Sequence, residues 1–340
     1  MTVHVGVIGA GWIGQDHIRR LTHAVAGAEV VAVSDIDTAR AEEAAARVGA
    51  RALATGADVS ASPDVDAVLV TSWGPTHAEH VRSAIIAGKP VFCEKPLATT
   101  AEDCLEIVEA EMSHGRRLVQ VGFMRRYDAA YRQLKNVLDS GAIGTPLMVH
   151  CAHRNPTVPA AYHSRMAAQD TAVHEIDAVR WLLDDEIVSA QVLSPRATSN
   201  RHEHLQDPQI MLFETAKGVR IDLEVFVNCQ YGYDIQCETV GETGLARLPD
   251  PATVAVRTAA KHSTAVLQDW KDRFVDAFDT EFGEWIASVR AGTDPVGPSA
   301  WDGYAATVIT DATVEALESG RVVGVSMKNR PAFYDTGSTQ

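Results

Sequence analysis

Two charged residues directly follow an apolar run with the composition of a buried strand. Glu94 and Lys95 come after residues 91–93, which are Val, Phe and Cys, and Pro96 follows them. Proline ends a hydrogen-bonded strand because it has no backbone N–H, and a tight turn here predicts a cis Lys95–Pro96 bond. Ligands of open α/β sheets bind just outside the carboxyl ends of the strands. The pattern therefore favours a lysine that contacts a ligand, with a solvated charge pair as the alternative.

An acid and a histidine form a second candidate pair. Asp170 and His174 stand four positions apart, near the start of a helix that the apolar spacing within 172–183 predicts. Side chains four apart share one helix face, and histidine is the side chain that most often transfers protons at neutral pH. A structural histidine or a surface Asp–His pair would explain the same spacing. The pair alone therefore leaves catalysis as one of several interpretations.

A glycine-rich turn near the N-terminus predicts a dinucleotide site. Gly9-x-Gly11-x-x-Gly14 follows the apolar run 3–8 and precedes a helical pattern. In such a turn Gly9 permits the sharp bend, Gly11 lets the backbone approach the pyrophosphate, and Gly14 allows close packing of helix and strand. The helix N-terminus would then face the phosphates.

An acid at the end of the next strand indicates which dinucleotide binds. Asp35 ends the strand-like run 29–34 and lies 21 residues after Gly14. At this spacing a carboxylate accepts hydrogen bonds from the adenosine ribose and repels the 2′-phosphate of NADP. Ile36 and Asp37 follow it, so no adjacent arginine reverses that preference. The sequence predicts NAD, although Asp35 could instead cap the next helix.

The order of the elements predicts two domains. Residues 1–124 alternate strands with helices, which indicates a doubly wound parallel sheet that binds NAD. Residues 125–340 carry strands joined in sequence, typical of an α+β domain that binds substrate and forms oligomers through a large, mainly antiparallel open sheet. The expected strands of this second domain are 187–194, 208–215, 219–228 and 233–240, and its expected helices are about 127–140, 270–291 and 301–319.

Composition excludes several classes of function. The formal net charge of −15 over 340 residues argues against nucleic acid or an anionic membrane as partner. The N-terminus lacks the basic and apolar regions of a secretory signal, and no apolar run is long enough to span a bilayer. Five scattered cysteines without a Cys-x-x-Cys motif favour reduced thiols and a cytoplasmic protein.

Together these motifs resemble the Gfo/Idh/MocA oxidoreductase family. The resemblance rests on Gly9-x-Gly11-x-x-Gly14, Glu94-Lys95-Pro96 and Asp170-x-x-x-His174. Segments spread over nearly the whole chain are similar to family members that oxidise inositol: 71–75, 92–100, 118–128, 150–158, 231–238 and 297–304. The resemblance implies a Rossmann domain followed by an α+β domain, a homotetramer assembled through the open sheets, and oxidation of myo-inositol to 2-keto-myo-inositol with NAD+.

The resemblance also assigns roles to residues. It implies the catalytic set Lys95, Asp170 and His174. Oxidising a secondary alcohol removes a hydride, which the cofactor accepts, and a proton, which the protein must accept. His174 is the expected general base, Asp170 would orient the substrate and stabilise the imidazolium, and Lys95 would hydrogen-bond the reacting oxygen.

Two larger sets of residues are expected to bind the ligands. The expected substrate site consists of Lys95, Arg125, His153, Asn155, Asp170, Thr171, His174 and Tyr233. The expected cofactor site consists of Gly9, Gly11, Trp12, Ile13, Gly14, Asp35, Ser72, Trp73, His77, Glu94 and Lys95. Trp12 departs from the family pattern, in which a small residue is more usual within the glycine turn.

Other functions stay open at this point. Four potential ligands, His150, His153, Asp170 and His174, would suit a metal hydrolase, but no short metal-binding motif is present and no metal is expected. A regulator that binds NAD without turnover would not need the complete Lys–Asp–His set. Within the enzyme class, the alternative is a dehydrogenase for another inositol isomer or for a pyranose sugar.

Overall fold

The computed structural model describes residues 2–335, which form two compact units. Within this range, the first unit contains 2–124, 278–307 and 327–335, and the second contains Arg125–Ala277 and Val308–Ser326. The sequence division placed all residues after 124 in the second domain, whereas 278–307 and 327–335 pack within the first unit. The assignment of NAD binding to the first part and of substrate binding to the second stays a prediction.

The first unit is built on a parallel sheet in the order β3-β2-β1-β4-β5-β6. This is the Rossmann strand order, in which the direction of winding reverses between β1 and β4. Every residue of β4, β5 and β6 is buried, as expected for parallel strands covered on both faces. The strands are β1 Val3–Ile8, β2 Ala28–Ser34, β3 Arg51–Ala52, β4 Ala67–Val70, β5 Val91–Glu94 and β6 Val119–Gly122.

Side chains at the N-termini set where several helices of the first unit begin. Asp37 accepts a hydrogen bond from the Arg40 N–H at the start of α2, and Thr100 does the same for the Asp103 N–H in α5. Gly49 ends α2 in the left-handed conformation, at φ 73°. The helices are α1 Trp12–His23, α2 Thr38–Val48, α3 Gly56–Ala61, α4 His77–Ile86 and α5 Ala101–His114, with short turns η1 Gly74–Thr76 and η4 Ala332–Tyr334.

Part of a late helix completes the core of the first unit. Helix α8 spans Trp270–Ala291 and departs from helical geometry at Phe274. Phe282, Trp285 and Ile286 are buried in the cluster that also contains Phe92 of β5. The rings of Phe282 and Phe92 stack with centroids 4.5 Å apart. Burial of this apolar helix face explains why residues from 278 onwards join the first unit.

The second unit contains a mixed sheet in the order β12-β11-β7-β10-β9-β8-β15. Its neighbouring strands are antiparallel except β7 and β10, which run parallel, so the predicted mainly antiparallel sheet is confirmed. The strands are β7 Pro146–Arg154, β8 Ile187–Leu193, β9 Gln209–Thr215, β10 Arg220–Phe226, β11 Asp234–Gly241, β12 Leu245–Arg247 and β15 Val323–Gly324.

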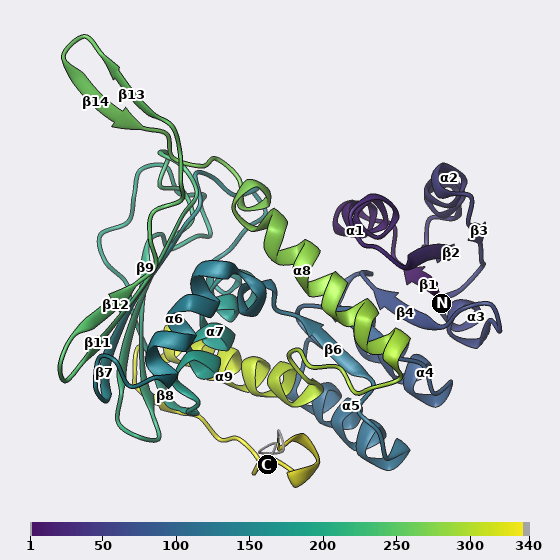
Figure 1. Cartoon of the computed structure of the whole chain (residues 1–340). Helices are drawn as coiled ribbons and strands as arrows, with labels where there is room; N and C mark the ends of the chain where they lie inside the picture. The colour runs from purple at the N-terminus through teal and green to yellow at the C-terminus, as the bar shows by residue number, and fades with distance from the viewer. Residues whose placement is uncertain (1, 336–340) are drawn as a thin grey trace. The chain divides into compact units, whose positions relative to one another are not determined.

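Helices and one hairpin complete the second unit. A π-helical segment, Ala167–Ala172, leads directly into α7, Val173–Leu183. Helix α6 spans Ala129–Asp139 after the turn η2 Met124–Tyr127, and helix α9 spans Ala300–Ser319, of which residues from Val308 belong to this unit. The hairpin of β13, Ala255–Thr258, and β14, Lys261–Thr264, extends beyond the mixed sheet (Figure 1).

Two further observations concern the environment of the chain. None of the helices within residues 2–335 combines the length and apolarity that crossing a lipid bilayer requires. All five cysteines are free thiols, and four of them are buried.

The C-terminal turn η4 is held by a buried carboxylate. Glu111 of α5 accepts hydrogen bonds from the backbone N–H groups of Leu118 and Val119 and from the Tyr334 hydroxyl, at 2.5, 2.6 and 2.5 Å. Burial raises the pKa of Glu111. We expect Tyr334→Phe to lower the free energy of unfolding by about 1–3 kcal/mol, because it removes a donor from a buried acceptor. Urea unfolding of the variant measures the difference.

Tyr231 provides a matched control for this prediction. Its hydroxyl also donates to a carboxylate, Asp234, at 2.6 Å, but its side chain is 46% exposed. Water can replace the lost hydroxyl there, so Tyr231→Phe should change the free energy of unfolding by less than about 0.5 kcal/mol. Equal effects of the two substitutions would show that burial does not determine the contribution of the Tyr334 hydrogen bond.

Candidate active site

Steric constraints shape the glycine turn that follows β1. Gly9 has φ +100°, and a Cβ there would lie 2.5 Å from the Ser72 nitrogen. A Cβ on Gly14 would lie 2.1 Å from the Gly9 carbonyl oxygen. The Thr71 hydroxyl donates to that same oxygen at 2.6 Å. The loop after β4 therefore holds the turn in place, and only glycine fits at these two positions.

Gly11 differs from the other two glycines. It has φ −66°, and a Cβ on it would meet no protein atom within 4 Å. Among the described residues, no side chain caps the N-terminus of α1, which begins at Trp12. An uncapped helix N-terminus beside open space suits a pyrophosphate, because its N–H groups and dipole favour an anion. The turn fits the dinucleotide that the sequence predicts.

Asp35 connects the turn to the start of α2. Its carboxylate accepts hydrogen bonds from the backbone N–H of Ala10 at 2.7 Å and of Asp37 at 2.9 Å. Asp37, not Asp35, caps α2, so the capping alternative for Asp35 is wrong. The Arg40 guanidinium lies 3.4 Å from the Asp35 carboxylate. Arg40 is five residues from Asp35 in the sequence, and the first turn of the helix brings it back to Asp35.

The predicted cofactor residues on α1 and in the loop after β4 differ in exposure and in hydrogen bonding. Trp73 is 77% exposed, and Trp12 on α1 is 55% exposed. Ser72 hydrogen-bonds through its hydroxyl to the Thr76 hydroxyl at 2.8 Å. His77 is buried, with one ring nitrogen 2.7 Å from the Pro96 carbonyl oxygen and the other 3.0 Å from that of Ser72. The His77 ring thus ties this loop to the turn after β5, and contact with NAD stays a prediction for these residues.

The turn after β5 carries the expected lysine. The Lys95–Pro96 peptide bond is cis, as predicted. Glu94 is only 8% exposed, and its carboxylate accepts hydrogen bonds from the Lys95 backbone N–H at 3.1 Å and from His17 at 2.7 Å. Burial raises the pKa of Glu94, but the His17 hydrogen bond and the Lys95 charge outweigh that effect, so its pKa lies below the ordinary value.

In the second unit, two predicted substrate residues meet a glutamate that sequence reasoning missed. Arg125 pairs with Glu175, and His153 lies 3.0 Å from the same carboxylate and 3.1 Å from the guanidinium. All three side chains are buried. Burial raises the pKa of Glu175, but Arg125 and His153 outweigh that effect and the pKa is lowered. Nothing in the sequence distinguishes Glu175 from an exposed helix acid, because its partners are 50 and 22 residues away.

The other predicted substrate residues of this unit have different partners. The Thr171 hydroxyl lies 2.6 Å from the Tyr162 hydroxyl, and burial raises the pKa of Tyr162. Tyr233 is buried and meets the His153 ring edge-to-face, with centroids 5.7 Å apart. Asn155 continues β7 beyond its last residue, since its backbone N–H donates to Phe226 at 3.0 Å. Their contact with a substrate stays a prediction.

Asp170 and His174 stand at a change of helix type. Asp170 belongs to the π-helical segment and His174 to α7, and both are partly exposed. The sequence predicted an ordinary helix here. Hydrogen bonds from i to i+5 widen a π turn, and such turns are often found at functional sites. Apolar spacing cannot reveal this widening, because it changes the backbone and not the set of buried residues.

The metal alternative is not supported by the placement of its residues. His150 and His153 are three apart on β7, so they project from opposite faces of the sheet. His150 pairs with Asp222, whereas His153 faces Glu175. Within residues 2–335, no group of three or more His, Cys, Asp or Glu side chains is arranged to hold a metal ion.

Known proteins resemble this chain along nearly its whole length. Residues 3–123 match the family described as an oxidoreductase family with an NAD-binding Rossmann fold, and 135–325 match its C-terminal alpha/beta domain. Inositol 2-dehydrogenase 3 of Saccharopolyspora erythraea is 70% identical over 334 residues, which are 98% of each chain. Inositol 2-dehydrogenase of Ralstonia nicotianae is 61% identical and covers 98% of this chain and 99% of its own.

A solved structure shows the same similarity. The crystal structure of myo-inositol dehydrogenase from Lactobacillus casei, in complex with NAD(H) and myo-inositol, has a TM-score of 0.97 and 44% identity. The similarity covers 98% of this chain and 100% of that one. Because both parts of the chain match the family and a close relative is similar from end to end, this chain belongs to the Gfo/Idh/MocA oxidoreductase family.

Proposed function

We propose that this protein oxidises myo-inositol to 2-keto-myo-inositol, with NAD+ as the hydride acceptor. The observation that carries the proposal is the end-to-end similarity to inositol dehydrogenases, including the structure solved with NAD(H) and myo-inositol at a TM-score of 0.97. The glycine turn with its uncapped helix N-terminus supports a dinucleotide. Initial rates of NADH formation with a panel of inositols and pyranose sugars test the assignment, and a preference for a sugar or another inositol isomer would replace the substrate named here.

The residues of the first unit would hold the cofactor. Gly9 and Gly14 shape the turn, Gly11 leaves room for the pyrophosphate, and Asp35 would accept hydrogen bonds from the adenosine ribose. NAD+, when bound, supplies the site that accepts the hydride. Lys95 would donate a hydrogen bond to the reacting oxygen and so favour its developing negative charge.

Residues of the second unit would move the proton and orient the polyol. His174 would take the hydroxyl proton, and Asp170, on the widened turn just before it, would orient the substrate and stabilise the imidazolium. Arg125 and His153 would donate to ring hydroxyls from an orientation held by Glu175. A buried hydroxyl without a partner costs about 1–3 kcal/mol, so matched polar groups would reject deoxy analogues. Asn155, Thr171 and Tyr233 would complete this set.

Assembly and location complete the proposal. We infer a homotetramer formed through the open sheet, supported by apolar side chains that are exposed on one face of its strands: Met148, Leu193 and Leu245. Sedimentation of the purified protein measures this state. A cytoplasmic location is supported by the five free thiols. A regulator that binds NAD without turnover is the non-enzymatic alternative, and a single assay of inositol oxidation separates it from an enzyme.

We expect NAD+ to be preferred over NADP+ by a large factor in kcat/KM, and Asp35→Ser to narrow that factor. The substitution removes the carboxylate that repels a 2′-phosphate, and it leaves the Arg40 guanidinium, now 3.4 Å from that carboxylate, available to the phosphate. Asp37→Asn is the control, since it also removes a negative charge next to Arg40 but preserves an N-cap. Equal use of both cofactors by the wild type would contradict the placement of Asp35 on the ribose.

We expect His174→Ala to lower kcat by a factor on the order of 10²–10⁴, because the base that accepts the proton is lost. NADH affinity should be nearly unchanged, since His174 belongs to the second unit and the expected cofactor residues belong to the first. Fluorescence titration with NADH and steady-state rates give the two quantities.

The pH profile tests the same assignment independently. A protonated base cannot accept a proton, so wild-type kcat/KM should fall on the acidic side and His174→Ala should lose that limb. Lys95→Met should lower kcat but keep the acidic limb. Near-wild-type turnover of His174→Ala, or an unaltered acidic limb in it, would move the base elsewhere, with Asp170 as the next candidate.

A further inference from the structure

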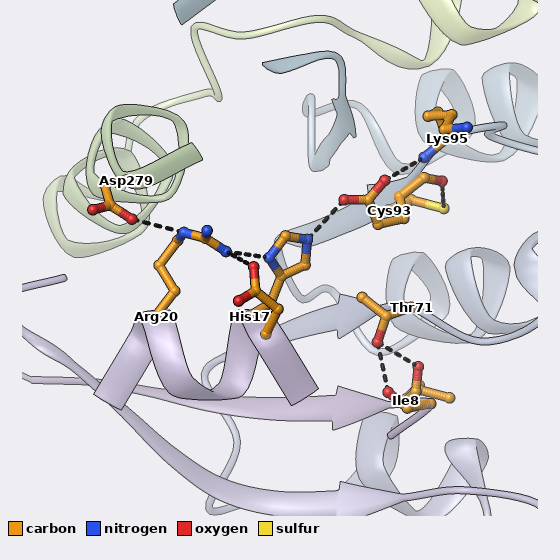
Figure 2. Close-up of polar contacts among 10 residues, drawn as sticks. Ile8, His17, Arg20, Thr71, Cys93, Lys95 and Asp279 are labelled. Carbon is orange, nitrogen blue, oxygen red and sulfur yellow. Dashed lines mark hydrogen bonds and ion pairs between the residues drawn. The ribbon is translucent and has the colours of Figure 1, made fainter. Parts of the chain in front are cut away.

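A chain of buried polar groups leads through the first unit to Lys95. His17 and Arg20, on one face of α1, are 0% and 2% exposed. The His17 Nε2 atom lies 2.7 Å from the Glu94 carboxylate, and the Arg20 guanidinium lies 2.8 Å from His17 Nδ1. Arg20 also donates to Asp279 of α8 at 2.7 Å. Figure 2 shows this path from Asp279 to Lys95.

The donors and acceptors of this path determine the tautomer of His17. A guanidinium donates hydrogen bonds and accepts none, so His17 Nδ1 facing Arg20 must be the acceptor. The ring proton is therefore on Nε2, where it is donated to Glu94. A second proton on Nδ1 would face the Arg20 N–H groups and their positive charge. Arg20 thus occupies the acceptor position of the ring and directs its Nε2–H at the carboxylate.

The surroundings of His17 make this hydrogen bond hard to replace. The ring packs against Phe282 and Phe278 of α8, with centroids 4.6 and 5.5 Å away. The Arg20 guanidinium lies over the Phe278 ring, 4.9 Å from its centroid. Apolar neighbours of this kind lower the local dielectric and strengthen each polar contact. A buried series of charged groups is weak evidence that these groups stabilise the fold, because apolar groups of similar volume often stabilise a core equally well.

Each oxygen of the Glu94 carboxylate accepts a hydrogen bond. Oε1 receives the His17 hydrogen bond, and Oε2 receives the one from the Lys95 backbone N–H. Gly122 of β6 leaves the space that the carboxylate occupies, since a Cβ there would lie 3.2 Å from the Glu94 carboxyl carbon. The orientation of Glu94, and through it the backbone at Lys95, therefore depends on the N–H of His17.

We propose that His17 is a positioning residue for Lys95: its Nε2–H, oriented by Arg20, holds the Glu94 carboxylate that holds the Lys95 backbone. The proposal rests on the proposed function, in which Lys95 hydrogen-bonds the reacting oxygen. His17 itself touches neither ligand in this scheme. A shift of about 1 Å in a catalytic group can lower turnover by about 10²-fold.

Two substitutions of His17 separate the two hydrogen bonds. Gln places an N–H near the position of Nε2, so His17→Gln retains the donor to Glu94 and loses the acceptor for Arg20. Asn places its carbonyl near Nδ1, so His17→Asn retains the acceptor for Arg20 and loses the donor to Glu94. We expect His17→Asn to lower kcat by about 10-fold to 100-fold and His17→Gln to stay within about threefold of the wild type. Thermal unfolding should shift similarly in both, because each loses one buried hydrogen bond.

A double-mutant cycle with Lys95→Met tests whether His17 acts through Lys95. If it does, His17→Asn combined with Lys95→Met should turn over inositol no more slowly than Lys95→Met alone. Losses that multiply in the double mutant would overturn the proposal, and so would equal turnover of His17→Asn and His17→Gln. Should Lys95→Met itself retain wild-type turnover, the proposed function of Lys95 fails and the positioning role fails with it. If only the two His17 variants are indistinguishable, the positioning role fails alone.

Glu94→Gln keeps the proposal testable if His17→Asn does not fold. One amide oxygen cannot accept from both His17 and Lys95 in the way that two carboxylate oxygens do. We expect this variant to lower kcat by a similar factor, with no further loss when it is combined with Lys95→Met. NADH titration serves as the control for a direct effect on the cofactor. Wild-type kcat in Glu94→Gln would overturn the proposal.

Discussion

A buried carboxylate stays ionised only when donors surround it, and this constraint governs the surroundings of the proposed catalytic and substrate residues. Glu94 accepts from a histidine ring and a backbone N–H, and Glu175 is paired with an arginine and a histidine. The pKa of each is lowered in spite of burial. Because moving either acid would leave a charge without partners, each one holds the orientation of the residues around it. Glu94 holds the backbone of Lys95 in this way in the first unit, and Glu175 holds Arg125 in the second.

The two units use different physical means to prepare their sites. In the first, the shape of the glycine turn is steric: Gly9 and Gly14 accept no side chain, and Thr71 secures the turn through one hydrogen bond. In the second, polar groups contributed by η2 and β7 are held by charge pairing with Glu175 of α7. A turn of this kind suits an anionic cofactor that binds along backbone N–H groups, whereas fixed side-chain donors suit a ligand with many hydroxyls.

Much of the fold follows from local patterns. Apolar runs followed by helical spacing predicted the parallel sheet, and turn signals between alternating strands predicted the second, mainly antiparallel sheet. The place of α8 was not predictable in this way: its aromatic face could be buried against either sheet, and only packing beside Phe92 assigns residues from 278 onwards to the first unit. The widened turn at Asp170 also escaped prediction, because the apolar residues around it keep helical spacing.

The sequence by itself determined the family and the glycine turn, and it predicted Lys95, Asp170 and His174 as the catalytic set, because each belongs to a short motif whose spacing has a direct physical meaning. Only the tertiary structure decided which other polar residues support those motifs. His17 and Glu94 are 77 residues apart, Arg125 and Glu175 are 50 apart, and Arg20 and Asp279 are 259 apart. Each of these residues is ordinary in its local segment. Their partnership arises when the strands and helices that carry them pack together and exclude water, since a charged or polar group in that setting must find a partner or destabilise the fold.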